Sequence, residues 1–161
     1  MKRLVRIVER IIKILFNISE ICMFCMMALV FIGVVMRYLF NNPLYWGEEL
    51  TNLFLVCFTF FSCAEILMNK KHIKLTLFMD KYSYKIKNIV ESFIACCGVL
   101  FSALVSKEIF SAALMAYNAN MTSPTLLSIP LVLPYSIMFV GFLFLSIAFL
   151  IQLCEFFPNI K

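Results

Sequence analysis

The chain has 161 residues, of which 63% are hydrophobic and 14% are charged, and its formal net charge is +5. Its mean hydropathy is +0.97, whereas soluble domains carry roughly 25% charged residues. A water-facing fold of this length could not cover so many apolar side chains, which excludes a soluble globular domain. The composition predicts one all-α domain over residues 1–161 that is embedded in a membrane.

The first thirteen residues form a basic, amphipathic arm. Cations alternate with apolar residues at helical spacing at Lys2, Arg3, Arg6, Arg10 and Lys13. A helix of this kind is predicted to lie on the anionic surface of the cytoplasmic leaflet. The apolar run that follows is too long for a cleaved signal peptide and lacks a small-residue cleavage site, so we expect the arm to be retained.

Four apolar stretches approach the length of about 20 residues that a transmembrane helix needs. They are expected at about residues 15–36, 50–68, 89–105 and 131–154. The third could extend to about residue 116, because the first turn signals come only at 118–124. The alternation typical of barrel strands is absent, and an open sheet cannot satisfy its backbone groups in lipid. The sequence therefore predicts four transmembrane helices.

The distribution of lysine and arginine predicts that both ends of the chain face the cytoplasm. The arm and the connection 69–88 are strongly basic, whereas the connection 37–49 and the stretch 106–130 carry few cations. The lysines of the inner connection are Lys70, Lys71, Lys74, Lys81, Lys85 and Lys87. Apolar residues alternate with them, so a short interfacial helix is possible there, and a solvated loop is the alternative.

Groups that could perform catalysis are scarce. The seven cysteines all lie in apolar stretches, which is typical of reduced packing residues, and the pair Cys22 and Cys25 has no second pair or histidine to complete a metal site. The single histidine, His72, lies in the basic inner connection, and no glycine-rich phosphate loop is present. We therefore expect no enzyme activity, no metal and no cofactor in this chain.

Three acidic residues are expected near the inner ends of the spans: Glu20, Glu65 and Glu91. Ionisable groups in a membrane are costly and often functional. Here two interpretations stay open, because the carboxylates could pair with the inner cations or could take part in ion coupling.

The connection between the first and second spans concentrates several physical roles. Tyr38, Tyr45 and Trp46 suit the aromatic belt of a membrane interface, and Pro43 prevents helix continuation. Two carboxylates, at residues 48 and 49, open the second span, where the helix dipole favours negative charge. Arg37 could pair with either of them. Physics alone predicts an anchored hairpin.

At these residues the chain resembles the DctQ family, the small membrane subunit of tripartite ATP-independent periplasmic (TRAP) transporters. The family signature corresponds to Arg37, Phe40, Pro43, Trp46, Glu48, Glu49 and Leu50. A second marker corresponds to His72 and Ile73, and a third to Ser128, Ile129 and Pro130. The chain departs from the family where a Gly-Ala element becomes Ser62, Cys63 and Ala64, and where Thr76 replaces an acidic residue.

The resemblance implies a heteromeric importer in the bacterial inner membrane. Its other parts would be a large multi-span subunit, which holds the substrate and sodium sites, and a periplasmic substrate-binding protein. This chain would be a lipid-embedded scaffold, with Gly33, Ser62 and Ala64 at close helix contacts. The substrate would be an organic acid such as a sialic acid or a dicarboxylate, and no nucleic acid is expected as a partner.

Two other classes share the hydropathy pattern. A small homodimeric multidrug exporter could use Glu20 as its carboxylate, but such antiparallel dimers need a weak charge bias, and the bias here is strong. An assembly subunit of another membrane complex would also lack catalytic groups, and only the motif around residues 37–50 separates it from the family resemblance.

Overall fold

The computed structural model describes residues 2–69, 84–125 and 127–156, which form four α-helices. These are α1 (Lys2–Leu39), α2 (Gly47–Asn69), α4 (Tyr84–Asn118) and α5 (Val132–Phe156). Each contains a segment long and apolar enough to cross a membrane. The prediction of an all-α fold with four transmembrane helices is confirmed. The predicted interfacial helix of the inner connection and His72 fall in the range 70–83, outside the described residues.

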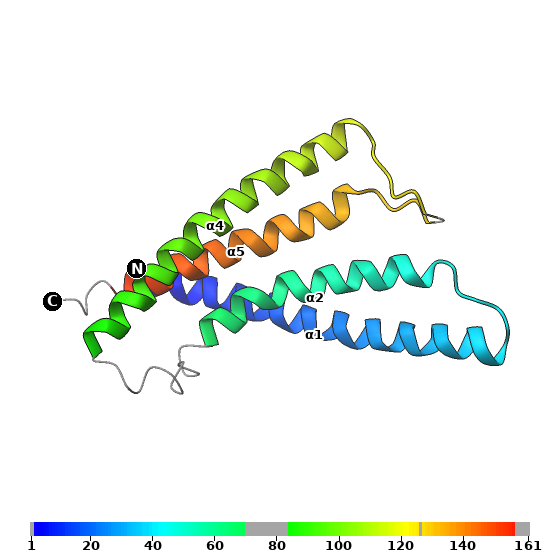
Figure 1. The fold of residues 1–161 in the computed structure, drawn as a ribbon, viewed down its shortest axis with the longest axis horizontal. Helices are drawn as coiled ribbons and strands as arrows, with labels where there is room; N and C mark the ends of the chain where they lie inside the picture. The colour runs from blue at the N-terminus through cyan, green and yellow to red at the C-terminus, as the bar shows by residue number, and fades with distance from the viewer. Residues whose placement is uncertain (1, 70–83, 126, 157–161) are drawn as a thin grey trace.

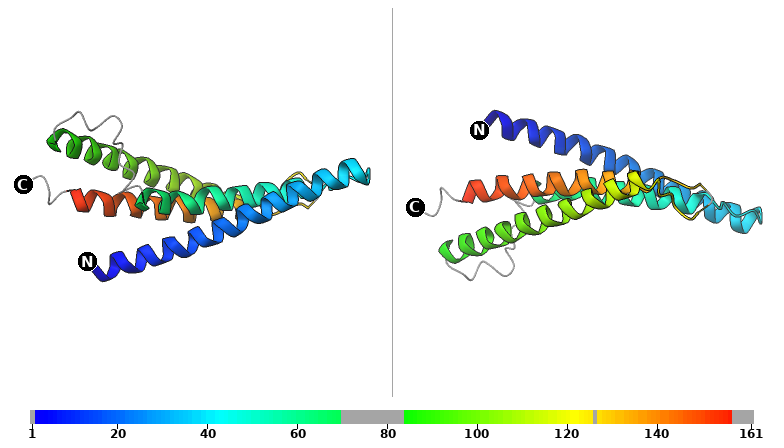
Figure 2. Two further views of the ribbon diagram at one scale, coloured as in Figure 1. Left: turned by 90° about the horizontal axis from the view of Figure 1, so that it is seen from below. Right: turned by 90° about the horizontal axis from the view of Figure 1, so that it is seen from above.

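The basic arm and the first span form one continuous helix of 38 residues. No glycine or proline occurs before Gly33, so no residue in the arm or the early span breaks the backbone hydrogen bonds. Figure 2 shows that the start of α1 diverges from the other helices. The arm therefore extends the axis of the span, and its position on a membrane surface stays a prediction.

A left-handed residue ends α1. Asn41 has φ 50°, a conformation that asparagine adopts more readily than most residues. The amide of Asn42 then donates to the carbonyl of Met36 at 3.1 Å, which satisfies one of the last free carbonyls of the helix. Pro43 follows, so the helix cannot resume before the turn that leads to Gly47.

The helices pack as a row in the order α1, α2, α5, α4. Extensive contacts join α1 to α2, α2 to α5 and α5 to α4. Figure 1 shows two hairpins, α1–α2 and α4–α5, with the start of α1 and the end of α5 at the same end of the molecule. We call the opposite end, where the connections 40–46 and 119–131 lie, the loop end. Helices α1 and α4 are thus the two edges of the row.

Small residues set the contacts between neighbouring helices. A Cβ atom built on Gly141 would lie 2.6 Å from Cβ and 2.7 Å from the carbonyl oxygen of Phe60, so α5 touches the backbone of α2. A Cβ atom on Gly98 would lie 2.6 Å from the ring of Phe149, where α4 meets α5. These contacts allow axes to approach closely, as is usual between transmembrane helices.

A small core lies toward the end of the bundle opposite the loop end. It joins Ile12, Ala64 and Ala148, from α1, α2 and α5. Ala64 is 2% exposed and Ser62, one half-turn away, is 5% exposed. Both residues therefore pack inside this chain.

Candidate functional site

The candidate site is at the loop end, where α2 meets the connection between α4 and α5. The amide of Leu127 donates a hydrogen bond of 2.9 Å to Oε1 of Glu49, which lies in the first turn of α2. The second carboxylate oxygen of Glu49 is buried and has no hydrogen-bond partner in the described part of the chain. Glu49 therefore ties two segments that are 78 residues apart in the sequence.

The connection 119–131 has internal hydrogen bonds that shape it around Glu49. Its two sides are joined by bonds from the amide of Ser123 to the carbonyl of Ile129 (2.9 Å) and from the amide of Leu131 to the carbonyl of Met121 (3.0 Å). Ser128, at its tip, has φ 48°. This arrangement directs the amide of the neighbouring Leu127 toward α2.

A cavity of about 170 Å³ lies beside this hydrogen bond. Its polar lining comes from Glu49, Asn52, Ser123 and Thr125, and its apolar lining from residues of α2, the connection and the start of α5. A cavity of this size and polarity has room for several waters that could satisfy the buried carboxylate oxygen. The connection 119–131 is therefore joined to α2 through a polar contact rather than through apolar packing alone.

The other motif residues of the connection 37–49 are more exposed than Glu49. Arg37 is in the last turn of α1, and Arg37, Phe40, Pro43 and Glu48 are exposed. Trp46 is 44% exposed. Within the residues that the structure describes, Arg37 makes no salt bridge to either carboxylate. The structure thus joins Glu49 to the α4–α5 connection instead of to Arg37, a contact that no short motif in the sequence indicated.

The acidic residues of the spans lie at different depths. Glu65 accepts a 3.0 Å hydrogen bond from Asn69 at the end of α2. Glu20 is exposed and lies deeper than expected. Ile12, eight residues before it, packs with Ala64 near the end of α2, which places Glu20 level with the middle of that helix. The difference arises because α1 already packs against α2 at Ile12, before the expected start of the first span.

The cysteines are free thiols. Among the described residues, no group of three or more His, Cys, Asp or Glu side chains is arranged to hold a metal ion. Gly33, which the sequence placed at a helix contact, would meet nothing within 4 Å if it carried a Cβ atom. Sequence reasoning missed Gly141, whose only signal was its presence in an otherwise bulky apolar span.

Comparison with known proteins identifies the family. The family described as the DctQ component of tripartite ATP-independent periplasmic transporters matches residues 26–159. The chain belongs to the DctQ family. It is therefore a multi-pass subunit of a transporter in the inner membrane and not an enzyme.

A curated relative agrees with this assignment. The chain is similar to the sialic acid TRAP transporter small permease protein SiaQ of Vibrio cholerae, with 32% identity over 77 residues. That match covers 45% of this chain and 44% of the relative. The chain thus spans less than half of the length of this relative. The family match, in contrast, covers most of the chain.

The Glu49 contact predicts a local effect that can be measured. Glu49→Ala removes the acceptor of the Leu127 amide, and loss of such a hydrogen bond costs about 1 kcal/mol at a partly exposed site. We expect the peptide around Leu127 to exchange its amide hydrogens faster in hydrogen–deuterium exchange mass spectrometry. Glu49→Gln keeps an acceptor oxygen and should exchange at nearly the wild-type rate.

The neighbouring carboxylate provides the matched control. Glu48 is exposed and has no hydrogen bond to the connection in the described structure, so Glu48→Ala should leave exchange at Leu127 unchanged. Equal acceleration in the Glu48 and Glu49 variants would show that the effect comes from charge at the start of α2 rather than from this hydrogen bond.

Proposed function

We propose that this DctQ chain is the small membrane scaffold of a sodium-coupled, binding-protein-dependent TRAP importer of an organic acid, such as a sialic acid or a dicarboxylate. The substrate and sodium sites belong to the large membrane subunit, and a periplasmic protein delivers the substrate. Membership of the family is the observation that supports this proposal most strongly. The printed name of the similar SiaQ protein gives sialic acid as one candidate substrate.

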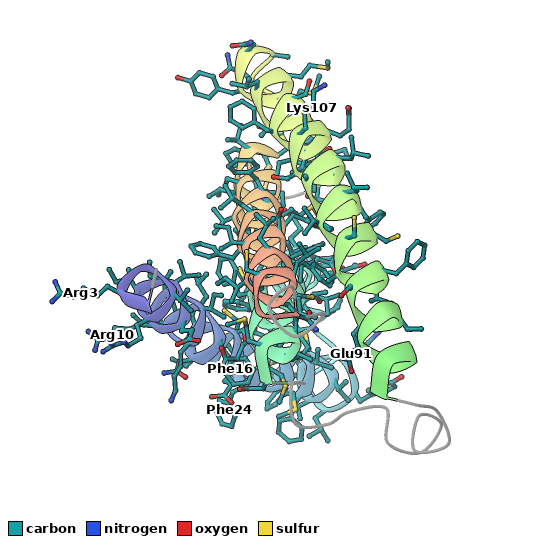
Figure 3. The ribbon with its side chains drawn as sticks, turned by 90° about the vertical axis from the view of Figure 1, so that its left-hand side faces the viewer. Arg3, Arg10, Phe16, Phe24, Glu91 and Lys107 are labelled. Carbon is teal, nitrogen blue, oxygen red and sulfur yellow. The ribbon has the colours of Figure 1, made fainter. Side chains whose placement is uncertain are left out.

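The arrangement of the helices supports a scaffold role. The hydrogen bond between Leu127 and Glu49 at the loop end and the close glycine contacts of α5 hold the row together. These contacts join helices to one another, as expected of a scaffold. Large apolar side chains of α1, such as Phe24 (69% exposed) and Phe31 (70% exposed), cover its free side. Figure 3 shows Phe24 on α1, with Phe16 also labelled on that helix. Lipid or a neighbouring helix can cover such a surface equally well.

The docking surface that we propose lies on α1. The two small residues of α2, Ser62 and Ala64, are buried inside this chain, so a partner cannot reach them. Gly33 lies on α1 with open space beside it, which would allow a helix of the large subunit to approach closely. In this proposal Arg37, Phe40, Pro43, Trp46, Glu48 and Glu49 hold the adjacent hairpin in the shape that the partner contacts, with both chain ends in the cytoplasm.

Co-purification tests this proposal. A tagged copy of this chain, expressed with the large membrane subunit of its transporter and extracted in mild detergent, should retain that subunit. Gly33→Leu should reduce the retained amount, because the leucine occupies the space left for the partner, while the isolated chain keeps its stability. Absence of the large subunit from the wild-type preparation would contradict the scaffold role, and full retention by Gly33→Leu would remove Gly33 from the interface.

A further inference from the structure

Helix α4 has a free side that faces away from the bundle. Its buried residues recur on the side that contacts α5 and are Ala95, Ser102, Ser106 and Ala116. On the opposite side, Leu100, Phe101, Leu104 and Met115 are between 60% and 65% exposed. Since α4 is an edge of the row, this side needs a cover of lipid or protein.

Two charged residues interrupt this apolar side at the middle of the membrane-spanning region. Lys107 and Glu108 are both exposed. Two contacts, Gly98 with Phe149 and Phe110 with Phe139, fix the register of α4 against α5 and place Lys107 beside residue 141 of α5.

The depth follows from the contact of Gly141 with Phe60, which lies in the middle of the 23-residue helix α2. Both charges are therefore near the middle of the bilayer. Figure 3 labels Lys107 well along α4 from Glu91. From the sequence, both residues belonged to the stretch 106–130, which was predicted to face outward.

Neither lipid nor the part of the chain that the structure describes supplies partners for these charges. In a helix, adjacent residues point about 100° apart and do not face each other, so Lys107 and Glu108 pair poorly with one another. No salt bridge joins either residue to a side chain in the described ranges. Lipid tails offer no hydrogen bonds, and phosphates lie about 15 Å from the middle of the bilayer.

The two charges are complementary to their own copy. If two parallel copies of α4 meet about a two-fold axis along the membrane normal, Lys107 of each copy faces Glu108 of the other at the same depth. Both charges are then satisfied by two equivalent ion pairs. We propose that α4 is the interface between two copies of this chain, held by reciprocal Lys107–Glu108 pairs.

The shape of the free side fits a helix–helix contact. Two small residues, Cys97 and Ser111, lie near the centre of this side, one before and one after the charged positions along the helix. Small residues at such positions let helices approach closely. The stem of Lys107 borders a groove of about 500 Å³ between α4 and α5, so its flank has room for a side chain of the second copy.

This interface is compatible with the proposed scaffold role but does not depend on it. The large subunit would contact the α1 edge of the row, and the second copy would contact the α4 edge, on the opposite side. The assembly would then contain two small and two large subunits. In the competing arrangement, a helix of the large subunit would cover α4. Exchanging the charges at residues 107 and 108 distinguishes this arrangement from a contact between two copies.

The test uses two full-length copies with different tags, expressed together with the large subunit and captured through one tag. Wild-type copies should capture each other. Lys107→Glu places like charges opposite each other and should lower capture on the order of tenfold. The double variant K107E/E108K remains complementary to itself, so two double-variant copies should capture each other again, while a double-variant copy should not capture a wild-type copy.

Each result has a defined meaning. Failure of wild-type copies to capture each other, unchanged capture by Lys107→Glu, or failure of the double variant to restore capture would each overturn the proposal. The large subunit retained in the same preparations reports on the scaffold role separately. Oxidative cross-linking in membranes provides a second test that does not depend on the folding of the charge variants. Wild-type chains should cross-link through Cys97. The Cys97→Ser variant should lose the cross-linked dimer, and the Cys96→Ser variant should keep it.

Discussion

Gly141→Ala is expected to lower the free energy of unfolding by about 1–3 kcal/mol, the usual cost of overpacking a close helix contact. The new methyl group would lie 2.6 Å from Cβ and 2.7 Å from the carbonyl oxygen of Phe60. The backbone of α2 cannot rotate away as a side chain can, so α2 and α5 must separate. Thermal unfolding of the purified chain in detergent, followed by circular dichroism, measures the change.

Two other helical glycines calibrate this result. Gly33→Ala meets nothing within 4 Å and should be neutral or stabilise by up to about 1 kcal/mol through helix propensity. The new methyl group of Gly98→Ala meets only the ring of Phe149, which can move. The change in the free energy of unfolding should therefore lie between those of Gly33→Ala and Gly141→Ala. If Gly141→Ala unfolded at or above the wild-type temperature, the close packing of α5 on α2 would be contradicted.

The helical architecture was predictable because hydropathy is a property of each segment by itself. The spans expected at 15–36, 50–68 and 131–154 lie within α1, α2 and, except for its first residue, α5. Helix α4 runs on to Asn118, consistent with the longer version of the third span. The exact ends differed where a helix continued through charged residues, as at the arm of α1.

The packing of the helices was not predictable in the same way. When nearly every residue of a helix is apolar, as in α5, periodicity no longer indicates which side faces a neighbour. Gly141 therefore looked like any other position, and Ala64 could not be distinguished from a residue that contacts a partner. The depth of Lys107 likewise depends on the register of α4 against α5, which no local pattern encodes.

The candidate site was predicted in part. The carboxylates at the start of α2 were identified from their position in a helix and from the family motif. The partner of Glu49 was not identified, because Leu127 contributes a backbone amide that carries no sequence signal. The packing of α5 against α2 holds that amide near α2, so the contact follows from tertiary structure.

Uptake by reconstituted vesicles is expected to show the largest effect of all. In our proposal the large subunit holds the transport pathway. The large subunit also requires this chain as a scaffold that keeps the non-moving part of the transporter in place in the bilayer. Omitting this chain should therefore reduce uptake to the level of empty vesicles. Replacing the inward sodium gradient with potassium should have the same effect.

The decisive measurement compares vesicles that contain both membrane subunits with vesicles that contain either one alone. The substrate is supplied on its binding protein, with sialic acid and C4 dicarboxylates tested first. We predict accumulation only when both subunits, the loaded binding protein and an inward sodium gradient are present. Equal accumulation by the large subunit without this chain, or substrate transport by this chain alone, would contradict the account.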